Sequence, residues 1–162
     1  MIEAALALQA ATPAHLLEPQ AMTEGFLAIC VRHVADPDAL RRAIRRSPLG
    51  FARARDEGQF EVYHSARATI RFLPETGCAL EAGLASRAAA TGVIDRAYAA
   101  LGASATPPGL VNRPGTGAMY MWRGPDVAGQ TRLTATLDWG HPGARQEEPV
   151  TLSLWAYRRP TP

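Results

Sequence analysis

The chain has 162 residues, a formal net charge of +2, 47% hydrophobic residues and 20% charged residues. This composition is typical of a folded domain and not of a disordered chain, and the small net charge does not indicate a protein that captures nucleic acid through a long-range field. All 17 basic residues are arginine, so an arginine here cannot be interpreted as chosen over lysine for bidentate recognition.

Residues 1–20 form an N-terminal segment in our interpretation, ahead of a single domain over residues 21–162. Residues 2–14 are rich in Ala and Leu and end in small residues, like the hydrophobic region and cleavage site of a signal peptide. Glu3 stands where a basic residue is usual, and the stretch is too short to span a bilayer. Two hypotheses stay open. Export, for example to the periplasm, is slightly favoured over a cytoplasmic protein with a short helix docked on the domain.

The first helix of the domain is expected to follow Thr23, because threonine caps helix N-termini. The preceding stretch Glu18–Ala21 contains a proline and is interpreted as a connection. Phe26 and Cys30 recur at helical spacing and are expected to face the core. Cys30 and Cys78 are the two cysteines of the chain and match no zinc or redox motif. They could form one disulfide in an oxidising compartment, or remain two buried thiols.

A second helix is expected from Asp36–Pro37, a cap residue followed by proline at the first helical position, to about Arg46. One side carries an apolar stripe, and the other carries Arg41, Arg42, Arg45 and Arg46. Four guanidinium groups within two turns are suited to bind phosphate or carboxylate groups, so this helix is a candidate site for anions or nucleic acid. The alternative is a solvated helix face. The small net charge makes nucleic acid an unfavoured partner.

From Phe60 onward the pattern changes to an alternation that predicts strands. A third helix is expected at about residues 87–101. The expected strands are residues 60–64, 69–73, 78–81, 118–123, 132–138 and 150–157. In the last two, one face is apolar and the other carries Thr, Ser, Trp and Tyr, which is typical of an antiparallel sheet with one covered face. We therefore expect an α+β domain in the order ααβββαβββ, with an antiparallel sheet of about six strands and helices mainly on one face. This order fits two α-βββ halves.

Aromatic residues concentrate in the C-terminal half of the sequence. Trp155 and Tyr157 are expected on the sheet face away from the helices, and Tyr120 and Trp122 are candidates to join them. Large rings beside Thr and Ser hydroxyls suit a sugar, a base or a peptide. The alternative is that the N-terminal segment or a second copy of the chain, in a homodimer, covers these rings. The Pro- and Gly-rich loop 106–117 is a second candidate binding element.

Asp138 and His141, at the end of an expected strand, are the candidate acid/base pair. No nucleophile motif accompanies them, and Asp-x-Gly is also ordinary turn sequence. His33 and His64 lie on faces expected to lean inward, without metal-ligand spacing, so no metal ion or cofactor is expected. The favoured hypothesis is a non-enzymatic binding or accessory domain with a protein or small-molecule partner and no transmembrane segment. A small hydrolase that uses Asp138 and His141 is the alternative.

Overall fold

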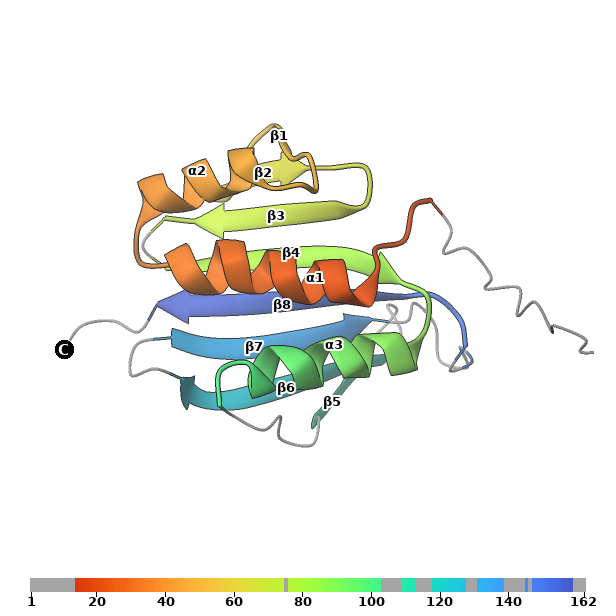
Figure 1. The fold of residues 1–162 in the computed structure, drawn as a ribbon. Helices are drawn as coiled ribbons and strands as arrows, with labels where there is room; N and C mark the ends of the chain where they lie inside the picture. Colours follow the sequence, from red (N-terminus) through yellow and green to blue (C-terminus); the bar gives the residue numbers. More distant parts are fainter. Residues whose placement is uncertain are drawn as a thin grey trace, which may run out of the picture.

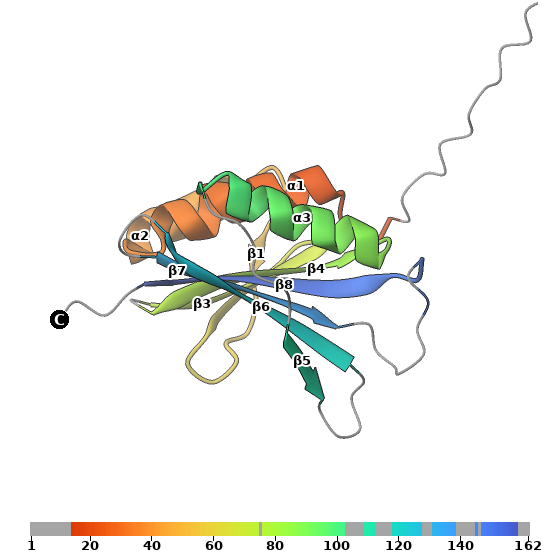
Figure 2. The same ribbon diagram turned by 90° about the horizontal axis from the view of Figure 1, so that it is seen from below.

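The described residues form an antiparallel sheet with three helical segments on one face (Figures 1 and 2). In this computed structural model the described residues are 14–74, 76–102, 109–112, 118–127, 131–138, 145 and 147–158. For 109–112, 118–127, 131–132 and 138 only the backbone is described. The helices are α1 (Pro19–Gly25), which continues into the π-helix η1 (Phe26–Val31), α2 (Pro37–Arg46) and α3 (Arg87–Ala99).

The sheet confirms the expected α+β class and the order of its elements. Its strands are β1 (Ala52–Arg53), β2 (Glu61–His64), β3 (Ala68–Leu73), β4 (Gly77–Leu84), β5 (Gly109–Asn112), β6 (Ala118–Val127), β7 (Thr131–Asp138) and β8 (Val150–Arg158). They lie in the order β1-β2-β3-β4-β8-β7-β6-β5, and neighbouring strands are antiparallel. The described sheet thus has two short edge strands, β1 and β5, in addition to the expected strands.

Counted inward from either edge, the strands follow their order in the chain: β1 to β4 from one edge and β5 to β8 from the other. Strands β1–β4 form one meander and β5–β8 form another, each preceded in the chain by helical structure. The last strands of the two meanders, β4 and β8, pair in the middle of the sheet from Gly77 opposite Tyr157 to Leu84 opposite Val150. Each half is therefore helical structure followed by four strands, which is the expected α-βββ half with one additional short edge strand.

The core lies between the helices and the covered face of the sheet. Alternate residues of β3, β4, β7 and β8 point into it, including Ile70, Phe72, Cys78, Leu80, Leu133, Ala135, Leu152 and Leu154, all at most 1% exposed. Helix α3 adds Val93 and Ile94, both fully buried. Tyr98 of α3 is also buried, and its hydroxyl donates to the carbonyl of Leu133 at 3.3 Å. In the strands that the helices cover, side chains therefore alternate between the buried core and the opposite face of the sheet.

The first helix begins earlier than expected. Pro19 occupies the first helical position, where its fixed φ fits and its missing N–H removes no hydrogen bond. Thr23 lies inside the helix and its hydroxyl donates to the Pro19 carbonyl at 3.1 Å, so the interpretation of Glu18–Ala21 as a connection was wrong. Ahead of the helix, Leu16 and Leu17 are 3% and 1% exposed, and the Leu17 N–H donates to the Gly83 carbonyl at 2.9 Å. The folded domain therefore includes residues before 21.

A disulfide joins the helical layer to the middle of the sheet. The sulfur atoms of Cys30, in η1, and Cys78, in β4, lie 2.00 Å apart, and their Cα atoms lie 5.2 Å apart. Both residues are fully buried. The bond therefore crosses the core at the point where η1 packs against β4.

Candidate functional site

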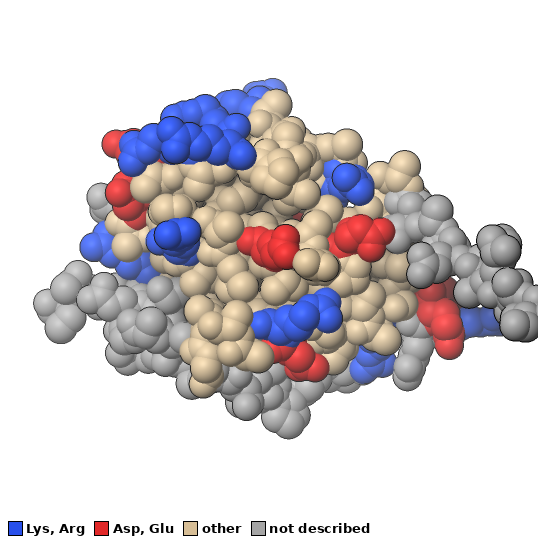
Figure 3. Space-filling model, in the orientation of Figure 1, with Lys and Arg blue, Asp and Glu red and all other residues tan. Residues whose placement is uncertain are grey.

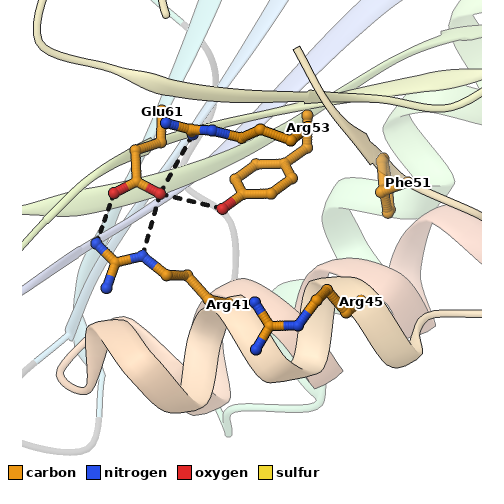
Figure 4. A pocket seen from close by; sticks show the side chains of 6 residues that line it. Arg41, Arg45, Phe51, Arg53 and Glu61 are labelled. Carbon is orange, nitrogen blue, oxygen red and sulfur yellow. Dashed lines mark hydrogen bonds and ion pairs between the residues drawn. The ribbon is translucent and has the colours of Figure 1, made fainter.

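A pocket of about 660 Å³ lies between α2 and the first two strands (Figure 4). Its walls carry side chains from three elements and one loop: Arg41, Arg45, Phe51, Arg53, Glu61 and Tyr63. Figure 4 shows Arg41 reaching from α2 to Glu61, Arg45 lying beside it along the helix, and Phe51 toward the other end of the pocket. The volume falls in the range of sites for small ligands, roughly 300–1,000 Å³.

Helix α2 holds its two arginines at the pocket by simple local rules. The Asp36 carboxylate caps the helix by accepting from the Ala39 N–H at 2.9 Å, a contact that lowers the pKa of Asp36. Leu40 and Ile44 are fully buried and hold the opposite side of the helix against the domain. Arg41 and Arg45, four residues apart, therefore lie one above the other along the same side of the helix.

Glu61 is the centre of the pocket's hydrogen-bond network. Arg41 donates two hydrogen bonds to it, from Nε to Oε2 at 3.1 Å and from Nη2 to Oε1 at 2.5 Å. Arg53 Nη1 and the Tyr63 hydroxyl donate to Oε2 at 3.2 and 3.0 Å. The hydrogen bonds from Arg41, and to a lesser degree that from Tyr63, lower the pKa of Glu61. Burial and the contact with Glu61 raise the pKa of Tyr63. Glu61 is therefore ionised and Tyr63 protonated at neutral pH.

The three arginines of the pocket differ in how far their charge is compensated. Arg41 pairs with Asp38 at 2.8 Å as well as with Glu61, and Arg53 pairs with Asp56 at 2.6 Å as well as with Glu61. Arg45 is exposed and makes no ion pair with any described side chain. The uncompensated positive charge of the pocket is therefore at Arg45.

The structure divides the four predicted helix arginines into two pairs. Arg41 and Arg45 line the pocket, whereas Arg42 and Arg46 are exposed and do not. Figure 3 shows basic side chains gathered over α2 on this face of the molecule. Sequence reasoning missed Phe51, Glu61 and Tyr63. The available sequence indication was a single carboxylate close to Val62 and Tyr63 in a short strand.

The sheet face away from the helices carries a second group of side chains. Trp155 and Tyr157 lie on it, as expected, with ring centroids 5.6 Å apart and nearly parallel planes. Phe60 meets the Trp155 ring edge-on at 6.0 Å. Nearby, Glu81 accepts from Ser153 Oγ at 2.8 Å and from Arg71 at 3.1 Å. The rings are half-buried rather than fully covered by the described residues.

The other predicted candidates lie wholly or partly outside the described residues. The register pairs Tyr120 with Leu137 and Trp122 with Ala135, but the side chains of Tyr120 and Trp122 are not described. The backbone of Asp138 pairs with Thr151 at the end of β7. His141 lies outside the described residues, as does most of the loop 106–117, apart from the β5 residues. The acid/base pair and the four-ring cluster therefore stay predictions.

No family model, curated protein or solved structure matches the chain. Within the described part of the chain, no helix is long and apolar enough to cross a membrane. Those same residues contain no group of three or more His, Cys, Asp or Glu side chains placed to hold a metal ion.

Proposed function

We propose that this protein is a small non-enzymatic binding domain that takes up a small organic anion in the pocket between α2 and β2. The observation that supports this most is the convergence of three arginines on a cavity whose lining holds one carboxylate. The lining thus carries a formal charge of +2, in a chain whose total is only +2. Guanidinium groups bind carboxylate and phosphate groups through paired N–H donors, and that of Arg45 has no ion-pair partner among the described side chains.

Contacts within the protein hold the pocket in place, which favours binding over mere surface charge. The Arg41–Glu61 contact and the buried Leu40 and Ile44 fix α2 over β2. The Arg53 guanidinium lies 5.1 Å from the centre of the Tyr63 ring, which adds a cation–π contact to the pocket wall. A cavity formed in advance lowers the entropy that must be lost when a ligand binds.

A titration of the full chain with small anions tests the proposal. Isothermal calorimetry or amide chemical shifts would be recorded with acetate, benzoate and inorganic phosphate at low ionic strength. We expect at least one of these to bind, with the largest shifts at the pocket residues. R45Q should weaken that binding by about tenfold or more, which corresponds to one charge-assisted hydrogen-bonded contact. R42Q is the matched control, because it removes the same charge from the same helix outside the pocket. Equal losses in both variants, or no binding at all, would refute the proposal.

The open sheet face supports a second candidate function. Trp155 and Tyr157 form a stacked, half-buried pair beside the hydroxyls of Ser153 and Thr134. Such a pair fits a sugar ring, which stacks on aromatic faces while its hydroxyls bond to nearby oxygens. Quenching or blue-shift of tryptophan emission on addition of mono- and disaccharides, lost in W155F, would support it. An unchanged emission spectrum at a sugar concentration 50-fold above a Kd of about 1 mM would exclude this function.

A further inference from the structure

The lining of the α2–β2 pocket also bears on the kind of anion, and this inference rests on the function proposed above. Glu61 already accepts two hydrogen bonds from Arg41 and one from Arg53. Arg41 also forms an ion pair with Asp38, and Arg53 forms one with Asp56. A ligand that competed for these donors would have to displace a hydrogen-bonded carboxylate. The available cation is therefore Arg45, one helical turn beyond Arg41.

Two aromatic rings complete the walls. Tyr63 is 6% exposed and Phe51 is half-buried against the edge of the core. In Figure 4, Glu61 lies at the Arg41 end of the pocket and Phe51 lies toward the other end. The pocket thus offers one unpaired guanidinium, with a fixed negative charge toward one end and an aromatic ring toward the other.

We infer that the pocket selects a monocarboxylate with an aromatic body: the carboxylate pairs with Arg45 and the ring packs on Phe51. A second negative charge on the ligand would approach the ionised Glu61, and like charges within a few ångströms repel strongly in a partly buried site. Glu61 is then a specificity-determining residue, because it orders Arg41 and Arg53 while it rejects dianions. Loss of the ring would remove the apolar contact that supplies much of the affinity of small ligands.

A comparison of four probes on the full wild-type chain tests this inference. We expect benzoate to bind at least tenfold more tightly than acetate, which lacks the ring, and tenfold more tightly than phthalate, which adds a second carboxylate to the same ring. Inorganic phosphate should bind more weakly than benzoate at pH 8, where it is mainly dianionic. R45Q should weaken benzoate binding tenfold or more, and the R42Q control should change it less than twofold.

The E61Q variant gives an independent readout of selectivity. Removing the negative charge should raise the affinity for phthalate and phosphate by at least tenfold relative to that for benzoate. If phthalate or phosphate binds wild type as tightly as benzoate, or acetate binds as tightly as benzoate, the inference is overturned while anion binding itself stands. If none of the four probes binds, the function proposed above fails with it.

Discussion

The disulfide between η1 and β4 should contribute a large share of the stability of this domain. Cys30 and Cys78 are 48 residues apart in the sequence. In the chain-entropy model, closing a loop of this length in the unfolded state stabilises the fold by about 4 kcal/mol. Domains of this size have a total stability of about 5–15 kcal/mol, so loss of the bond should remove a substantial part of it. The melting temperature should then fall by about 8–16 °C.

Urea denaturation monitored by circular dichroism, with and without a reductant, measures this contribution. The double variant C30A/C78A is the matched control, because it lacks the bond and should not respond to the reductant. Reduced wild type should unfold at a lower urea concentration and with a steeper dependence on urea, since its unfolded state is less constrained. If the oxidised and reduced proteins share one midpoint, the bond adds no stability and the loop-entropy reasoning is refuted.

Two further stability predictions follow from the buried contacts. E61Q should cost about 2 kcal/mol at pH 7, because it leaves the half-buried Arg41 without its main partner. Since the folded-state pKa of Glu61 is depressed, its stabilisation is fully present above the unfolded value of about 4.5 and is lost as pH falls through the folded value. The gap between wild type and E61Q should therefore narrow below pH 4.5 in parallel urea titrations. L17A should cost about 3 kcal/mol, because Leu17 is buried ahead of α1. Its exposed neighbour provides the control E18A, which should change stability by less than about 0.5 kcal/mol.

A specific outcome would contradict each of these two stability predictions. A difference between wild type and E61Q that stays constant from pH 7 to pH 3.5 would show that Glu61 contributes through packing and not through its charge. An L17A variant as stable as E18A would show that the segment before α1 is not part of the cooperative unit.

The architecture was predictable because the covered strands alternate over many residues. In β8, Leu152, Leu154 and Ala156 are buried while Ser153 and Trp155 are partly exposed, and this pattern is visible in the sequence. Such alternation fixes which face of a strand meets the core, since a one-residue slip would reverse every side chain. The class, the element order and the position of Trp155 and Tyr157 follow from it.

The pocket was not predictable because β2 is short and carries a buried residue on each of its two faces. His64 was expected to lean inward, yet it is exposed, and Tyr63 and Glu61 point to the helix side instead. Four residues contain too few alternations to assign faces, and Val62 is buried on the other side. The decisive contact, Arg41 to Glu61, joins residues 20 apart and depends on the packing of α2 over the sheet. Local pattern carries no information about such a pairing.

The place of β8 in the sheet has a consequence for how the chain is made. This strand lies between β4 and β7, yet it leaves the ribosome after both of them. Its pairs with β4 join residues as far apart as Gly77 and Tyr157, so the two meanders become one sheet only at a late, long-range step. A nascent or truncated chain that stops before Val150 would keep two hydrogen-bonding edges open. Such edges are templates for strand addition by neighbouring chains, so incomplete copies should tend to aggregate.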